Sequence, residues 1–117
     1  ALSPRYLQRV RDYVHEAGGL LIADEVQAGF GRAGVWWGHV LSDVTPDILT
    51  LGKPMAAGYP MAGVVARGDL LDNFRKGEMY FNTFAGNPTA CVVAKAVIEI
   101  LDREQPWRPR KPSDFRR

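Results

Sequence analysis

The sequence predicts an α/β fold built on a mostly parallel sheet. Two short apolar runs, Leu20–Ala23 and Ile48–Leu51, have the length expected of buried strands, and segments with helical periodicity alternate with them. The first run leads into Asp24 and the second into Lys53. Because chemistry collects at the carboxyl ends of strands in open α/β sheets, we expect this acid and this amine to face one cleft.

The first helix is predicted between Ser3 and Gly18. Ser3 and Pro4 form a cap followed by proline in the first turn, and Gly18–Gly19 ends the helix. Four apolar residues share one helical face, as expected of a helix laid on a sheet: Leu7, Val10, Val14 and Ala17.

The middle of the chain is predicted as a loop, a strand and a third apolar segment. Residues 28–38 mix glycines with three aromatic residues and have no regular period. The turn Thr45–Asp47 then leads into the second strand. Residues Met61–Ala66 form the third apolar segment.

Two further helices are expected toward the C-terminus. Asp69 is predicted to cap a short helix that runs through Phe74. Asn87 and Pro88 open a longer helix, through about Asp102. Its inward face is predicted to carry Cys91, Ala94, Val97, Ile98 and Leu101.

Composition restricts the possible classes. With 46% hydrophobic residues in 117, the chain has enough apolar side chains for a core. It shows neither a stretch long enough to cross a bilayer nor a leader pattern, so we expect a cytoplasmic protein without membrane contact. The single Cys91 is predicted to be a buried structural thiol, and His15 and His39 lack partners at metal-ligand spacing.

The last residues differ from the rest. Residues 106–117 hold five basic residues and one acid, whereas the remainder holds 10 basic and 12 acidic residues. We interpret residues 105–117 as a basic, proline-rich tail that is disordered or foreign to the fold, and we do not expect it to bind nucleic acid.

Three motifs, in order and spacing, resemble the signatures of a known family. They are residues 22–32 (IADEVQAGFGR), 46–53 (PDILTLGK) and 82–88 (NTFAGNP). Together they resemble the class III aminotransferases, which use pyridoxal 5'-phosphate (PLP) and have the fold of the fold-type I PLP enzymes. The resemblance implies that residues 1–104 are part of the PLP-binding large domain, with its mostly parallel sheet. Enzymes of this kind are several times longer, which implies a fragment that is inactive alone.

The resemblance assigns a role to each residue of the expected site. Lys53 matches the lysine that joins the cofactor as an imine and moves the substrate proton. Asp24 matches the carboxylate that keeps the pyridine nitrogen protonated. Val26 matches the residue on the ring face, and Gln27 matches the hydrogen-bond donor to the ring hydroxyl. Thr83 matches a residue that reaches the cofactor phosphate of a neighbouring subunit, which implies a homodimer.

Two other residues of the first motif are interpreted as structural. Glu25 and Arg32 are expected to form a charge pair or to anchor the loop. The spacing Gly29-x-Gly31-x-x-Gly34 satisfies a dinucleotide-binding pattern, but residues 35–38 do not start a helix and the next strand leads into a lysine. We therefore do not expect a nicotinamide or flavin site.

Three functions remain open. The first is amino transfer between an amino acid or amine and a keto acid. The second is phosphate elimination from a phosphorylated amine, since residues 53–60 (KPMAAGYP) resemble the phospho-lyase subgroup of the family. The third is an inactive, truncated piece that exposes unpaired strand edges and apolar helix faces.

Overall fold

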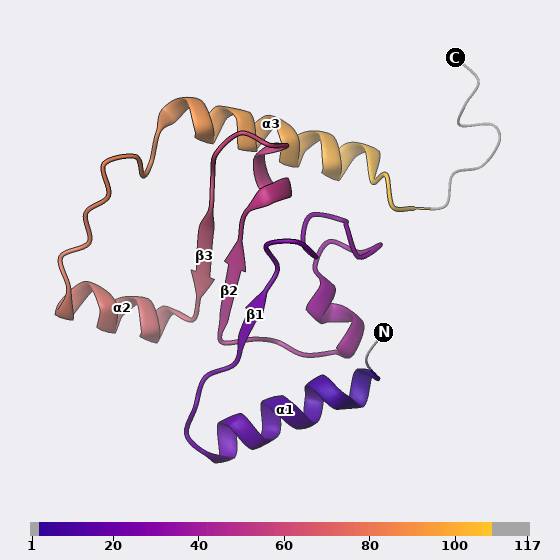
Figure 1. The fold of residues 1–117 in the computed structure, drawn as a ribbon, viewed down its shortest axis with the longest axis vertical. Coiled ribbons are helices and arrows are strands. Elements are labelled where there is room, and N and C mark those ends of the chain that lie inside the picture. The colour runs from indigo at the N-terminus through magenta and orange to yellow at the C-terminus, as the bar shows by residue number, and fades with distance from the viewer. Residues whose placement is uncertain (1–2, 109–117) are drawn as a thin grey trace.

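The protein is an α/β layer in which helices flank a three-stranded sheet (Figure 1). The structure is a computed structural model that describes residues 3–108. The elements in chain order are α1 (Pro4–Glu16), β1 (Ile22–Asp24), η1 (Gly38–Ser42), β2 (Ile48–Leu51), η2 (Lys53–Ala56), β3 (Gly63–Ala66), α2 (Gly68–Gly77) and α3 (Pro88–Glu104). In this part of the chain no helix combines the length and apolarity that a membrane crossing requires.

The sheet is mixed, with strand order β1-β2-β3. β1 and β2 are parallel, and the Cα partners include Ile22 with Ile48 and Asp24 with Thr50. β3 runs antiparallel to β2, with Leu51 opposite Gly63. The α/β class is therefore confirmed, and one of the two strand pairings is parallel. The link 52–62 contains only the short η2 and a turn with left-handed residues at Ala57 and Gly58, so the chain returns beside β2 without the helical crossover that a parallel strand needs.

The helix ends follow local capping chemistry. Asn87 Oδ1 accepts hydrogen bonds from the N–H groups of Thr89 (2.9 Å) and Ala90 (3.3 Å), which confirms the predicted start of α3. The predicted cap at Asp69 is wrong, because α2 begins at Gly68 after Arg67. Asp69 lies in the first turn, where its carboxylate accepts two hydrogen bonds from the Arg67 guanidinium and where negative charge suits the helix dipole.

The inward face predicted for α3 is only partly correct. Ala90 and Ala94 are buried, and the helix makes its main contact with η2. Cys91 and Ile98 are exposed, so the prediction of a buried thiol is wrong. The small alanines allow η2 to approach closely, and the described elements leave the flanking positions of the helix uncovered.

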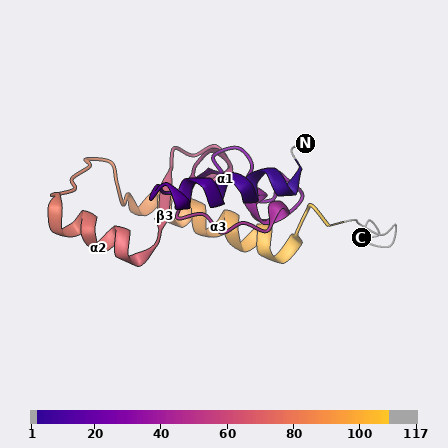
Figure 2. The ribbon, with the colours of Figure 1, turned by 90° about the horizontal axis from the view of Figure 1, so that it is seen from below.

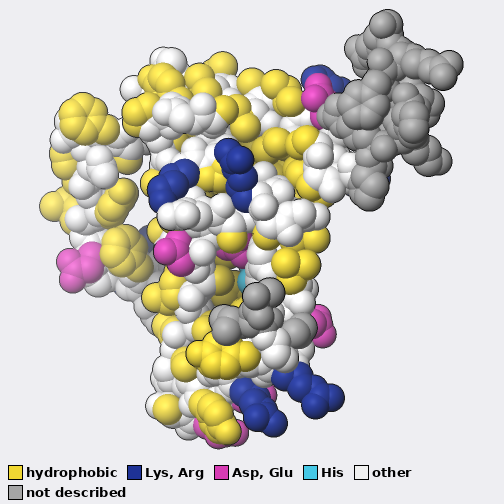
Figure 3. Space-filling view, turned by 45° about the vertical axis from the view of Figure 1, so that its right-hand side comes forward, with side chains coloured by type: hydrophobic (Ala, Val, Ile, Leu, Met, Phe, Trp, Pro, Cys, Tyr) yellow, Lys and Arg dark blue, Asp and Glu magenta, His cyan; other side chains and the backbone are white. Residues whose placement is uncertain are grey.

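The described chain is open and flat. Its radius of gyration is 17.1 Å, whereas a compact domain of this length is expected near 13 Å. The shortest dimension is 18 Å, and Figure 2 shows the thin layer from below. Figure 3 shows hydrophobic side chains over much of one face. The most exposed of the large apolar side chains are Met79, Phe84 and Phe81. Such a surface is typical of an element that packs against further protein.

One buried carboxylate joins the elements at the end of the sheet where β1 and β2 begin. Asp47 is 5% exposed, and its Oδ2 lies 2.8 Å from His15 Nε2 and accepts the Leu21 N–H at 2.8 Å. Its Oδ1 accepts a hydrogen bond from Arg67 at 2.7 Å. These bonds from His15, Leu21 and Arg67 hold the pKa of Asp47 well below its usual range. Asp47 thus ties α1 and the start of β1 to Arg67, which precedes α2.

We predict that Asp47→Asn lowers the thermal midpoint in a pH-dependent way. A carboxyl whose pKa is depressed by folding stabilises the fold above its unfolded pKa of about 4, and the stabilisation is lost as the pH falls below that value. Thermal unfolding of wild type and variant should therefore differ most near neutrality and converge in acid. Asp43→Asn is the control, since Asp43 is exposed and makes no side-chain bond within residues 3–108. Equal effects of the two substitutions would contradict this role for Asp47.

Candidate active site

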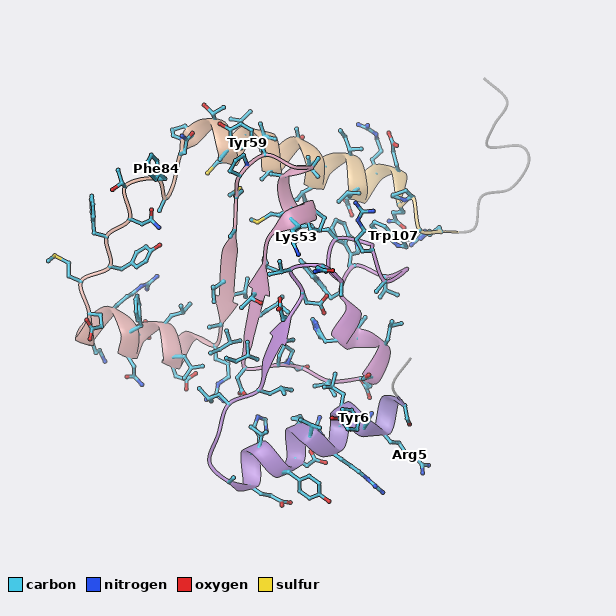
Figure 4. The ribbon with its side chains drawn as sticks, in the orientation of Figure 1. Arg5, Tyr6, Lys53, Tyr59, Phe84 and Trp107 are labelled. Atoms are coloured by element: carbon cyan, nitrogen blue, oxygen red, sulfur yellow. The ribbon has the colours of Figure 1, made fainter. Side chains whose placement is uncertain are left out.

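The predicted acid and amine lie at the same edge of the sheet. Asp24 is the last residue of β1, and Lys53 follows β2 after a single glycine, Gly52. Because β1 and β2 are parallel and pair Asp24 with Thr50, both strands finish at this edge. Figure 4 shows Lys53 above the end of β2, at the start of η2. The side chain of Lys53 is exposed.

The carboxylate of Asp24 is oriented by two hydrogen bonds. Its Oδ1 accepts the backbone N–H of Val26 at 3.0 Å and the hydroxyl of Thr50 at 3.0 Å. Within residues 3–108, Oδ2 has no hydrogen-bond partner. The group is therefore fixed in direction and retains one oxygen for a further donor.

Val26 packs against the backbone that leads to Lys53. A Cβ placed on Gly52 would lie 3.3 Å from Val26 Cγ1, closer than most such contacts. Gly52 itself is buried and extended, so a side chain here would be opposed by this close contact with Val26 and not by a left-handed conformation. The valine of the first motif thus touches the end of the second motif.

Lys53 opens on a hollow of about 700 Å³. The hollow is lined by Gln27, Arg32, Lys53, Pro54, Ala57 and Gly58. The structure therefore brings Lys53 together with Gln27, as the sequence predicts. Asp24, which ends β1, lines neither this hollow nor the larger, mainly apolar one of about 1160 Å³ beside β3 and α3, which Val26 borders. The expectation that Asp24 and Lys53 face one cleft is therefore wrong for the described chain, although both lie at one edge of the sheet.

Thr83 lines neither hollow, although its neighbours Asn82 and Phe84 border the larger one with Val26. It belongs to the exposed segment between α2 and α3, where Asn82 Oδ1 accepts the Phe84 N–H at 3.0 Å. In Figure 4 the adjacent Phe84 and Lys53 lie on opposite sides of β3. The fold of a single chain does not bring Thr83 to the lysine.

Glu25 anchors the loop that follows β1. The residue is 2% exposed, and its carboxylate accepts hydrogen bonds from the N–H groups of Gly38 (2.9 Å) and His39 (2.7 Å), while Oε1 lies 2.9 Å from His39 Nδ1. The anchoring interpretation is thus confirmed. The predicted charge pair with Arg32 is wrong, because His39 and the two backbone groups occupy the carboxylate.

An aromatic cluster holds the same loop, and it includes a residue assigned to the tail. Phe30 and Trp37 meet edge to face at 5.0 Å between ring centroids, and Trp36 meets Trp107 at 5.1 Å. A Cβ on Gly31, which has a φ of +86°, would overlap the Trp107 ring. In the sequence, no pattern beyond the aromatic residue itself indicates this contact. The remaining tail, residues 109–117, lies outside the described residues.

The metal and dinucleotide patterns weighed in the sequence can be compared with the described residues. Residues 3–108 contain no group of three or more His, Cys, Asp or Glu side chains that could hold a metal ion. The loop after β1 continues as turns into η1, and no α-helix begins at the glycines as a dinucleotide fold requires.

A comparison with protein families gives one match of decisive length. The family described as Aminotransferase class-III matches residues 1–109. The chain belongs to the class III aminotransferases. The family relation agrees with the three motifs, of which two lie at the strand edge described above.

Curated class III relatives include an alanine–glyoxylate aminotransferase 2-like protein of Drosophila melanogaster. It is 45% identical over 101 residues, which cover 85% of this chain and 20% of the relative. The chain thus spans about a fifth of the length of this relative.

Solved structures confirm the fold of this class III segment. A phospholyase from Arthrobacter in complex with phosphoethanolamine superposes with a TM-score of 0.82 at 46% identity, covering 86% of this chain and 24% of the other. An S-selective transaminase from Arthrobacter sp. with alanine bound gives 0.82 at 34% identity, covering 90% and 23%. Both reaction types considered from the sequence are therefore represented among its structural relatives.

Proposed function

We propose that this chain supplies the lysine and the aspartate of a PLP site in a class III aminotransferase. The observation that carries the proposal is the parallel pairing of β1 and β2, which ends one strand in the Asp24 carboxylate and leads the other into the Lys53 amine. When bound, PLP supplies an aldehyde that condenses with amines and a ring that accepts electrons. The function is the transfer of an amino group between an amino acid or amine and a keto acid.

Each residue of the site has a proposed task. Lys53 holds the cofactor covalently and moves the proton at the substrate α-carbon. Asp24, with Oδ2 lacking a partner in the described chain, keeps the pyridine nitrogen protonated through charge pairing. Val26 packs on the ring face, and Gln27, which shares the hollow of Lys53, donates to the ring hydroxyl. The residues present fit the group in their chemistry, because they supply an amine, a carboxylate with one oxygen left over and an amide donor at one edge of the sheet, although only Gln27 shares the hollow of Lys53.

We propose further that the full enzyme is a homodimer in which Thr83 serves the other subunit. Its exposed segment and its separation from Lys53 within one chain support a role across an interface. Exposed apolar side chains in the same segment, Met79, Phe81 and Phe84, support the burial of this segment against protein. The hydroxyl of Thr83 would bind the cofactor phosphate.

A second candidate is phosphate elimination from a phosphorylated amine. The 46% identity to the Arthrobacter phospholyase, whose structure holds phosphoethanolamine, favours it, as does the resemblance of residues 53–60 to that subgroup. The two functions share the cofactor and Lys53. They differ in the fate of the substrate, because only amino transfer needs a keto acid acceptor.

We predict that PLP modifies Lys53 in preference to the other lysines. The chain is incubated with PLP, reduced with borohydride and digested, and the pyridoxyl group is located by mass spectrometry. Lys53 should carry most of the label, and Lys53→Ala should leave only the background found at the three other lysines, Lys76, Lys95 and Lys111. Lys95→Ala is the matched control and should leave Lys53 labelled. Equal labelling of all lysines would contradict the proposed role.

We predict amino transfer when the chain replaces the matching segment of the S-selective transaminase from Arthrobacter sp. The chimera should transfer the amino group of alanine to a keto acid, and Lys53→Ala should abolish the reaction. The unmodified host is the reference for activity. Release of inorganic phosphate from phosphoethanolamine without any keto acid, in place of amino transfer, would contradict the first function and favour the second.

A further inference from the structure

The hollow of Lys53 is built from two separate elements. The loop after β1 supplies Gln27 and Arg32, and η2 with the turn after it supplies the other lining residues, Lys53 among them. The shape of the hollow therefore depends on how the loop and η2 are held relative to each other.

The loop has a backbone that its surroundings must hold in place. Phe30 has a φ of +56° and Gly31 a φ of +86°, so two consecutive residues are left-handed. A bulky residue such as phenylalanine keeps this conformation only where its neighbours enforce it. The Phe30 residue is buried, and its ring meets Trp37 edge to face. Aromatic packing thus stabilises the conformation of the loop.

Trp107 completes this packing from the other end of the described chain. Beyond α3, Gln105 is left-handed with a φ of +40°, and its carbonyl accepts the Arg108 N–H at 2.9 Å. This turn places Trp107 on Gly31, where an added Cβ would overlap the indole, and against the ring of Trp36. Figure 4 shows Trp107 beside the end of α3. Trp107 therefore contacts the loop at two points.

The helix that leads into Trp107 also packs on the second element of the hollow. α3 makes its main contact with η2, which begins at Lys53, and the buried residues of the helix are Ala90 and Ala94. α3 and Trp107 together thus join the loop after β1 to η2, by a route separate from the pairing of β1 with β2.

We propose that Trp107 is a positioning residue for the PLP site. Trp107 does not line the hollow itself. It holds Gly31 and Trp36 against the end of α3, and so fixes the loop relative to η2 and shapes the space in which PLP reaches Lys53. The inference rests on the proposed function, because it takes Lys53 as the amine that PLP modifies.

The test compares four forms of the 117-residue chain: the wild type, Trp107→Ala, Trp107→Phe and Tyr13→Ala. Trp107→Phe keeps an aromatic ring at the contact and should retain most of the wild-type behaviour. Tyr13→Ala is the matched control, because it removes an exposed aromatic side chain of α1.

Amide hydrogen exchange, followed by NMR, measures the loop and the far end of the sheet separately. The Gly34 N–H donates to the Gly31 carbonyl at 3.0 Å, and the Asp47 N–H donates to the Leu21 carbonyl at 2.9 Å. Trp107→Ala should speed the exchange of the Gly34 amide about tenfold and leave the Asp47 amide unchanged, because the loop opens locally. Equal acceleration at both amides, or none at Gly34, would overturn the proposal.

Pyridoxyl labelling measures the consequence for the hollow. After PLP and borohydride, the ratio of label at Lys53 to label at Lys95 should fall about threefold or more in Trp107→Ala, because the reacting groups are less well placed. Trp107→Phe should restore most of the ratio, and Tyr13→Ala should not change it. A faster Gly34 amide with an unchanged ratio would mean that Trp107 holds the loop alone, and the proposal would fail.

A measurement without PLP keeps this inference distinct from the proposed function. The side-chain amide of Gln27 and the methyl group of Ala57 belong to the two elements that line the hollow, and NMR follows both. If PLP shows no preference for Lys53 in the wild type, while Trp107→Ala shifts both resonances and Tyr13→Ala shifts neither, the proposed function fails and the role of Trp107 in shaping the hollow stands. Selective labelling of Lys53 that Trp107→Ala leaves unchanged refutes only the present inference.

Discussion

The parallel register of β1 and β2 is the constraint on which the candidate site depends. It pairs Asp24 with Thr50, so that the Thr50 hydroxyl orients the carboxylate and the next residues of β2 carry the chain to Lys53. Val26 then packs on Gly52, which fixes the two strand ends against each other. A slip of this register by one residue would turn Thr50 to the other face and separate the acid from its support.

The two ends of the sheet have different tasks. At the end where β1 and β2 begin, Asp47 is hydrogen-bonded to His15, the Leu21 N–H and Arg67. This hydrogen-bond network joins elements that are distant in sequence. At the other end, polar groups remain open to a ligand: one oxygen of Asp24, the Lys53 amine and the Arg32 guanidinium. The buried carboxylates are thus satisfied at both ends, Asp47 at one and Glu25 at the other, and the end where chemistry is expected also carries exposed charges without a partner in residues 3–108.

Features that depend on a few neighbouring residues could be predicted from the sequence. The strand from Ile48 to Leu51 and the cap at Asn87 follow from short apolar runs and from hydrogen-bonding chemistry within a few residues. The partner of Glu25, the exposure of Cys91 and the packing of Trp107 on Gly31 depend on contacts between distant segments, and the sequence carries no periodic signal for them. The antiparallel return of β3 depends on the length of the link before it. Motif resemblance predicted the site residues, and the folded chain shows that Phe84, the neighbour of Thr83, lies on the other side of β3 from Lys53.

The most direct measurement is the protonation of the cofactor ring beside Asp24. PLP labelled with ¹⁵N in the ring is fixed to Lys53 by borohydride, and the nitrogen chemical shift is recorded across the pH range. The account places the side chains of Asp24 and Lys53 at opposite ends of one ring. It therefore predicts that the ring nitrogen stays protonated to a higher pH in the wild-type chain than in Asp24→Asn. Asp43→Asn should behave as wild type. An identical titration in all three proteins would contradict the account.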